Sequence, residues 1–161
     1  MSYLQKLDAI DRRILEILQS NGKITNAQLA VEVGLSPAPT LERVKKMERN
    51  EIITSYHAKL NHQRIGIGVS TFVLVTLKSH NKKHLEHFVK CVNLIDEIIE
   101  CHHITGAGDF ILKIVCKDIQ AYQQLMLEKV SDIDGVDNLQ SMIAMSTYKD
   151  SKVIPIPDGE K

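Results

Sequence analysis

The sequence predicts an α+β protein in which a helical N-terminal part precedes a larger part made of strands and helices. Two observations predict this class. Up to about residue 50 the apolar residues recur at helical spacing, whereas runs such as "VSTFVLVTLK" at 69–78 are apolar and rich in β-branched residues. The second part has the order β-α-β-β-α-β. Two right-handed β-α-β units can merge into one four-stranded antiparallel sheet with both helices on one face, the ferredoxin-like plan.

The composition is that of an ordinary globular protein, with 161 residues, 43% hydrophobic and 25% charged, enough for one domain or two small ones. No apolar run is long enough to span a membrane, and "MSYLQKLDAIDRR" has charge where a signal peptide needs an apolar stretch. The three cysteines, Cys91, Cys101 and Cys116, form no CxxC pair. We therefore expect a cytoplasmic protein with reduced, mostly buried thiols.

The net charge is zero, which argues against a globally basic nucleic-acid-binding protein. Residues 1–60 nevertheless carry nine Lys/Arg against seven Asp/Glu. Binding to DNA would therefore depend on a local patch and on several copies of the chain.

The first two predicted helices are separated by a short polar turn. Residues 8–20 form the first, with Asp8 as its N-cap. Thr25 begins the second, and Gln28 three residues later completes a capping box, in which each side chain satisfies a backbone donor of the other. Gly34 is suited to the left-handed conformation that ends a helix.

The third predicted helix has a rigid start. Ser36 is its N-cap, and Pro37 occupies the first helical position, where a missing N–H costs nothing. Pro39 also falls in the first turn, whose donors have no partner within the helix. The helix is expected to run to about Asn50. The following stretch, "EIITSYHAKLN", is short enough to be a wing or a connecting strand.

The predicted plan has four segments: a DNA-binding domain at 1–60, a linker at 61–68, the sheet domain at 69–148 and a flexible polar tail at 149–161. Within the sheet domain we expect strands at 69–78, 97–105, 110–117 and 135–148, and helices at 81–95 and 118–133, the latter capped by Asp118. Phe72 and Leu74 alternate with Val73 and Val75, so this strand is apolar on both faces. The face without helices is therefore expected to pack against a partner, which predicts a dimer or a larger assembly.

Three helices with a glycine between the second and third indicate a helix-turn-helix. If Leu41, Val44 and Met47 face inward, the cations of the third helix lie on the opposite, outer side. Small residues at its start, Ala38 and Pro39, permit close approach to bases and can touch a thymine methyl.

The predicted DNA contacts come from the helix starts and from the outer side of the third helix. Arg43 is expected on a base edge or a phosphate, and Lys45, Lys46 and Arg49 on phosphates. Thr25 and Ser36 stand at helix N-termini, where free N–H groups can hold a phosphate. The full set is Thr25, Ser36, Ala38, Pro39, Arg43, Lys45, Lys46 and Arg49. A small helical bundle with a solvated charged face is the alternative interpretation.

The chain resembles the Lrp/AsnC family of "feast/famine" regulators. The matching stretches are "LDAIDRRILEILQSNGKITNAQLA", "VGLSPAPTLERVKKME", "ITSYHAKLN", "ECHHITGAGDFILKI" and "DGVDNLQSMIAMSTYK", which follow in order along nearly the whole chain. The resemblance implies an N-terminal winged helix-turn-helix joined to a βαββαβ effector and oligomerisation domain. It also implies dimers that assemble into octamers as tetramers of dimers, with an amino acid bound between dimers.

The resemblance further implies an effector pocket lined by the turn Gly106, Ala107, Gly108 and Asp109 and completed from a neighbouring subunit by Leu139, Gln140 and Ser141. Asp109 would face the ammonium of an amino acid, and N–H groups of the glycine-rich turn would face its carboxylate. From the residues alone, "GAGD" is only a weak signal for a ligand site, and a plain β-hairpin turn is the favoured explanation. The family usually has a glycine after the third helix, where this chain has Asn50-Glu51; Asn tolerates the left-handed geometry.

These observations predict a sequence-specific DNA-binding transcriptional regulator whose assembly and DNA binding respond to an amino acid. We expect no enzymatic activity, cofactor or metal; His84 and His87 could reach one ion, but surface histidines are the plainer explanation. Two alternatives remain. One is an architectural DNA-binding protein without an effector, and the other is a ligand-binding or enzymatic ferredoxin-like domain that does not bind DNA.

Overall fold

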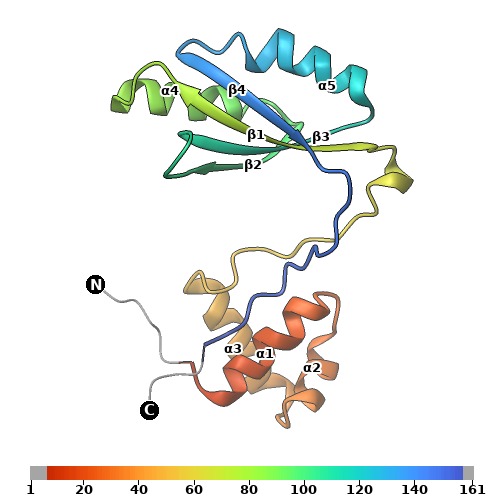
Figure 1. Cartoon of the computed structure of the whole chain (residues 1–161). Helices are drawn as coiled ribbons and strands as arrows, with labels where there is room; N and C mark the ends of the chain where they lie inside the picture. Colours follow the sequence, from red (N-terminus) through yellow and green to blue (C-terminus); the bar gives the residue numbers. More distant parts are fainter. Residues whose placement is uncertain (1–6, 158–161) are drawn as a thin grey trace. The chain divides into compact units, whose positions relative to one another are not determined.

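The computed structural model describes residues 7–157, which form two compact units (Figure 1). The helical unit joins residues 7–59 to residues 149–157 of the C-terminal tail. The sheet unit is Leu60–Tyr148. None of the helices in the described part of the chain is both long and apolar enough to cross a membrane.

The helical unit contains α1 (Ala9–Ser20), α2 (Asn26–Glu32) and α3 (Pro37–Arg49). The expected helix starts are confirmed: Asp8 and Thr25 each form a capping box, with Asp11 and Gln28 respectively. Gly34, between α2 and α3, has a φ of +69°, the left-handed conformation expected there.

The core of this unit is made by Ile14, Leu15, Leu29 and Met47, with partly buried aliphatic residues around it. Residues 51–61 form neither helix nor strand, so a connecting strand there is not found. Ile52 and Ile53 instead pack against the core as irregular chain. The left-handed residue of the turn after α3 is Glu51, with a φ of 56°, and not Asn50.

The tail is not free over its described residues, contrary to expectation. The Gln19 side chain on α1 accepts a hydrogen bond from the Ile154 N–H at 2.7 Å and donates one to the Ile154 carbonyl at 3.1 Å. The Lys59 ammonium donates to the Asp150 carbonyl at 2.6 Å, and Ile156 packs against the helical core. Local composition suggested flexibility, but these long-range contacts attach the tail to the helical unit.

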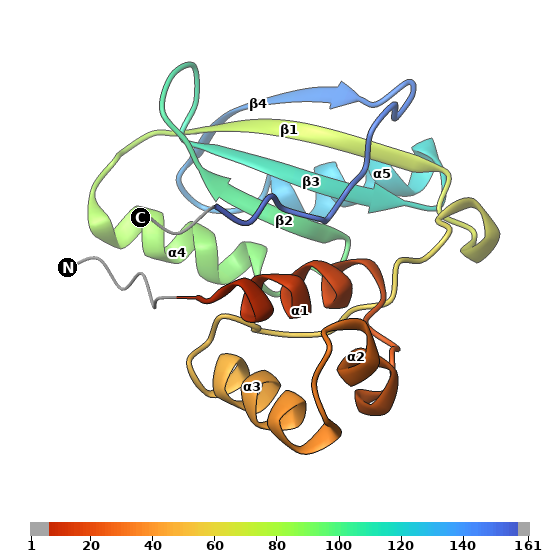
Figure 2. The same ribbon diagram turned by 90° about the horizontal axis from the view of Figure 1, so that it is seen from below.

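The sheet unit follows the predicted β-α-β-β-α-β order. A short 3₁₀ turn (Gln63–Ile65) comes before the first strand. The elements that follow it are β1 (Val69–Leu77), α4 (Lys82–Val92), β2 (Ile98–His103), β3 (Phe110–Cys116), α5 (Ile119–Leu125) and β4 (Val136–Ile143). A π-helical turn (Met126–Val130) continues α5. The strand order is β2-β3-β1-β4 with antiparallel neighbours, as Figure 2 shows. This order confirms the ferredoxin-like plan.

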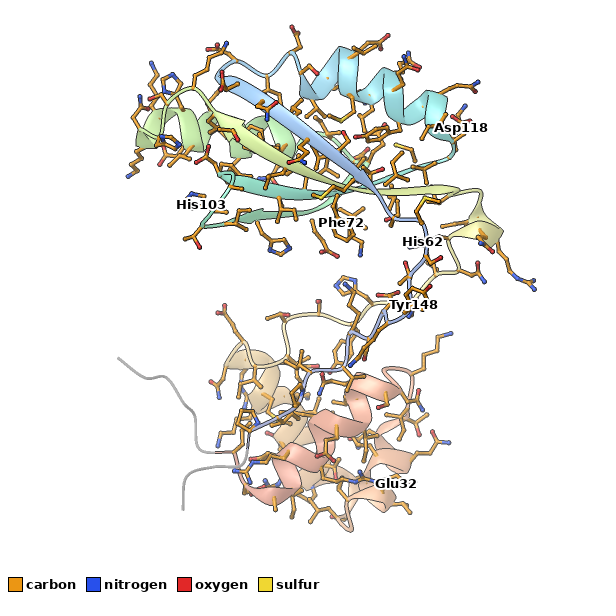
Figure 3. All side chains as sticks on the ribbon, in the orientation of Figure 1. Glu32, His62, Phe72, His103, Asp118 and Tyr148 are labelled. Carbon is orange, nitrogen blue, oxygen red and sulfur yellow. The ribbon has the colours of Figure 1, made fainter. Side chains whose placement is uncertain are left out.

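Both helices of this unit cover the same face of the sheet (Figure 1). Toward them, Val73, Val75 and Leu112 are fully buried, with Phe88 of α4 packed in the same core. Within the sheet unit, no helix covers the other face, and Phe72 of β1 lies there, 38% exposed (Figure 3). The strand is therefore apolar on both faces, but α4 and α5 cover only one of them.

The three cysteines are free thiols. Cys116 is buried, whereas Cys91 and Cys101 are partly exposed. Burial raises the pKa of the Cys101 thiol, and burial followed by the nearby Glu97 carboxylate raises that of Cys116. Both therefore stay protonated at neutral pH.

Candidate nucleic-acid interface and ligand region

The inner side of α3 differs from the predicted stripe. Thr40 and Met47 are buried and Val44 is partly buried, but Leu41 is 40% exposed, so its inward placement was wrong. Thr40 can occupy the core because its hydroxyl donates to the Ser36 carbonyl at 3.0 Å, one turn earlier. The inward stripe is thus Thr40, Val44 and Met47, and Leu41 lies toward the outer side.

Apart from Arg43, the residues of α3 that were predicted to contact DNA are exposed. They comprise the small residues at its start and three cations: Ala38, Pro39, Lys45, Lys46 and Arg49. Ser36 is the N-cap of α3 as expected, but its side chain makes no capping hydrogen bond. The Asn26 amide donates to the Pro37 carbonyl at 2.8 Å and so ties α2 to the start of α3. The hydroxyl of Thr25, by contrast, is occupied by its capping box with Gln28.

Arg43 is engaged inside the helical unit. Its guanidinium lies 2.6 Å from the Asp8 carboxylate and 2.7 Å from that of Asp11, both at the start of α1. The Asp11 N–H and then the Arg43 side chain lower the pKa of Asp8, and the two carboxylates raise that of Arg43. The two carboxylates lie 35 and 32 residues before Arg43 in the sequence, so no local pattern indicated this contact.

A second polar contact fixes the chain just after α3. The Tyr56 hydroxyl donates to the Glu48 carboxylate at 2.9 Å. Burial, and then this anionic acceptor, raise the pKa of Tyr56 to about 12. Glu48 is therefore engaged with Tyr56 on the side of α3 where the chain leaves the helix.

In the sheet unit, the turn 106–109 lies against β1. A Cβ added to Gly108 would come within 2.8 Å of the Leu74 side chain and 3.0 Å of the Val75 carbonyl oxygen, so only glycine fits there without a shift. The neighbouring Asp109 N–H donates to that same Val75 carbonyl at 2.8 Å. The turn is therefore pressed onto the central strand.

Asp109 is 9% exposed, and its carboxylate already has two partners. One oxygen accepts the Leu77 N–H at 2.7 Å, and the other lies 2.9 Å from His80 Nε2. The predicted anion for an amino-acid ammonium is thus also the group that holds the turn to the end of β1. His80 also belongs to this region, although no motif in the sequence indicated it.

The three residues of β4 that were predicted to line the effector pocket lie along the edge of β1 opposite to β3, in the same chain. Leu139 pairs with Val75, Gln140 with Leu74 and Ser141 with Val73. Because successive strand residues point to opposite faces, these three cannot line one surface. The Ser141 hydroxyl accepts a hydrogen bond from Tyr122 of α5, which places it on the helix side.

Gln140 shares the uncovered face with Leu74, the side chain against which Gly108 lies. The turn and Gln140 of β4 are therefore both neighbours of Leu74. The described residues contain no group of three or more His, Cys, Asp or Glu side chains placed to hold a metal ion.

Comparison with known proteins decides what these two units are. Residues 70–154 match the Lrp/AsnC ligand binding domain, and residues 7–54 match a winged helix-turn-helix DNA-binding domain. The chain belongs to the Lrp/AsnC family. Its predicted fold and its predicted function as a DNA-binding transcriptional regulator are thereby confirmed, and the family is one of regulators rather than enzymes.

Relatives in this family match the chain over almost its whole length. Leucine-responsive regulatory proteins of Escherichia coli strain K12 and Klebsiella pneumoniae are each 38% identical over 150 residues, 93% of this chain and 92% of theirs. A transcriptional regulator from Neisseria meningitidis, solved in complex with L-Met, is 31% identical, with a TM-score of 0.89 over 93% of this chain and 97% of its own. An AsnC family regulator from Agrobacterium tumefaciens is 32% identical, with a TM-score of 0.87 over 92% and 97%.

Proposed function

We propose that this Lrp/AsnC regulator binds an amino acid where the turn 106–109 meets β1 and β4. The observation that carries the proposal is that Gly108 and Gln140 are both neighbours of Leu74, one from the turn and one from β4. It is supported by the similar Neisseria regulator, which was solved with L-Met.

The turn supplies the polar groups that a zwitterion needs. Backbone N–H groups of Gly106, Ala107 and Gly108 would donate to the ligand carboxylate. Asp109 Oδ1 faces His80, which is 70% exposed, so the ligand ammonium can displace that imidazole. Gln140 would contact the ligand from β4, while Leu139 and Ser141 support the strand from the helix side.

The uncovered face of the sheet, on which this site lies, also supports the proposed assembly. The uncovered face of the sheet presents Phe72 and Met142, 38% and 43% exposed, and such apolar area is stabilised by burial against a second copy. The ligand would then lie close to a subunit boundary, with octamers forming as tetramers of dimers. A ligand bound there can change the spacing of the helix-turn-helix units, to which multivalent DNA binding is sensitive.

On DNA, α3 would enter the major groove. Lys45, Lys46 and Arg49 would contact phosphates, and Ala38 and Pro39 would allow close approach to the base edges. Thr25 and Ser36 would lie near the backbone at the starts of α2 and α3. Arg43 would act by holding α3 against α1 rather than by touching DNA, because both its carboxylate partners lie within the helical unit.

The test is a gel shift on the chain's own promoter DNA at fixed salt, with each of the twenty amino acids in turn; salt is fixed because phosphate contacts make affinity salt-dependent. We expect one or a few amino acids to change the shift, and Gln140→Ala to abolish that response. Asn138→Ala is the matched control, since Asn138 lies one pair further along the same face of β4. A shift indifferent to every amino acid would contradict the effector site and favour an architectural role.

A further inference from the structure

An exposed leucine and an exposed glutamate lie next to each other on the outer side of α3. Leu41 is 40% exposed, and Glu42 is exposed as well. They follow Ala38 by three and four residues, so all three share one side of the helix near its N-terminal end. This side is opposite the buried Thr40 and Met47.

The position of these side chains matters because of how such helices dock. A recognition helix presents its N-terminal residues to base edges in the major groove, whereas positions further along approach the phosphates. On α3 the cations Lys45 and Arg49 occupy the later turns, and the stripe before them offers Ala38, Leu41 and Glu42. Bases and phosphates would thus meet different chemical groups.

Glu42 is the more informative of the two. Phosphates repel a carboxylate beside DNA, and a hydrogen bond that a base donates to the carboxylate can offset this repulsion. No side chain forms an ion pair with Glu42 within residues 7–157, since the nearby Arg43 is held by Asp8 and Asp11. Its acceptor oxygens are therefore available to a donor outside the chain.

We propose that Leu41 and Glu42 are specificity-determining residues that read two pyrimidines. Leu41 packs against the 5-methyl group of a thymine, and Glu42 accepts a hydrogen bond from the N4 amino group of a cytosine. The inference rests on the DNA-binding function and goes beyond it, because it names the bases that α3 recognises. Each half-site then contains a thymine and a cytosine at neighbouring positions.

The glutamate is tested by selecting binding sites from random duplex DNA with the full-length wild type and with Glu42→Gln. Glutamine prefers adenine, to which it donates and from which it accepts. We expect one position of the selected site to change from cytosine to adenine, with about a tenfold change in relative affinity for the two bases. An unchanged selected sequence would overturn the role of Glu42.

The leucine is tested by replacing each thymine of the selected site with deoxyuridine, which lacks the 5-methyl group. At one position we expect the wild type to lose about fourfold in affinity, the loss that follows from one buried methyl group. Leu41→Ala should bind both DNAs equally. A deoxyuridine effect that persists undiminished in Leu41→Ala would overturn the role of Leu41.

Two control variants distinguish a failure of this proposal from a failure of the DNA-binding function. Val31→Ala removes an exposed apolar side chain from α2, 80% exposed, and should leave the selected sequence and the deoxyuridine effect unchanged. Lys45→Ala should weaken binding to all sequences and lower the salt slope by about one. If wild type binds no DNA, the DNA-binding function itself fails; if it binds and neither Glu42→Gln nor Leu41→Ala alters base preference, only this inference fails.

Discussion

Arg43 shows that a cation on a DNA-binding helix can serve the fold. Its guanidinium contacts Asp8 and Asp11, and the Asp11 side chain is only 17% exposed. A charge-assisted contact with a largely covered partner is stronger than an ordinary surface ion pair. The contact therefore fixes the angle between α1 and α3, on which the presentation of the outer side of α3 depends.

We predict that Arg43→Ala and Asp11→Ala each lower the stability of the helical unit by about 1 kcal/mol. The double variant should lose less than the sum, because both changes remove the same contact. Hydrogen exchange of the α1 and α3 amides measures the loss in the full-length chain. Additive losses would show that the two residues do not act on each other, and Arg43 would then return to the set of DNA contacts.

Tyr56 gives the helical unit a dependence on alkaline pH. Its pKa is raised to about 12, while a tyrosine in the unfolded chain titrates near 10. Between these values the unfolded chain loses the proton and the folded chain keeps it, so stability falls as the pH rises.

We expect the melting temperature of the wild type to fall more steeply between about pH 10 and pH 12 than that of Tyr56→Phe. Melting curves followed by circular dichroism at several pH values provide the measurement. Tyr148→Phe is the control, because Tyr148 is 98% exposed and should leave the slope unaltered. Equal slopes for all three proteins would rule out Tyr56 as the titrating group.

At the scale of elements, the helical unit consists of three helices plus the described part of the tail. Gln19 holds both the N–H and the carbonyl of Ile154, as a neighbouring strand would. Two residues later, Ile156 packs against the core that the helices form. The segment after β4 is therefore part of the DNA-binding unit, although it lies at the far end of the sequence.

We predict that Ile156→Ala destabilises the helical unit by about 1–2 kcal/mol, since it removes partly buried apolar area. Ile154→Ala is a matched control: that side chain is 69% exposed, and its backbone groups, which bond to Gln19, would remain. Protease sensitivity and thermal melting compare the two variants. Similar behaviour of both would mean that the tail adds nothing to the core.

At the scale of the whole molecule, the sheet has one covered and one uncovered face. The uncovered face is apolar around Phe72 and Met142, with Lys113 and Glu100 paired beside them at 3.2 Å. Burying this face against a second copy would stabilise both chains, and it would bring two ligand regions into one assembly. Oligomerisation and ligand binding are then properties of the same surface.

We expect Phe72→Glu to shift the protein toward monomers, because it places a charge in the centre of the proposed interface. Light scattering coupled to size-exclusion chromatography measures the mass directly. Leu94→Glu is the control, since Leu94 is 84% exposed outside the sheet and should not affect the mass. A Phe72→Glu protein with unchanged mass would place the subunit contact elsewhere.

The sequence by itself determined the helix starts, the order of strands and helices, and the family. These follow from local signals: Asp8 and Thr25 cap helices within three residues of themselves, and the apolar period changes from helical to strand-like after residue 68. Such short-range signals depend little on how the rest of the chain packs. The predicted helices and strands and their arrangement were accordingly confirmed, whereas residues 51–61, for which a wing or a connecting strand was open, form no strand.

Only the tertiary structure decided what the polar side chains do. Arg43 meets Asp11 across 32 residues, Asp109 meets the Leu77 N–H across 32, and Gln19 meets Ile154 across 135. A partner that far along the chain leaves no trace in a local pattern, so Arg43 looked like a DNA contact and the tail looked free. The burial of Thr40 in place of Leu41 has the same origin, because it depends on how the three helices pack and on a hydroxyl that can bond within its own helix.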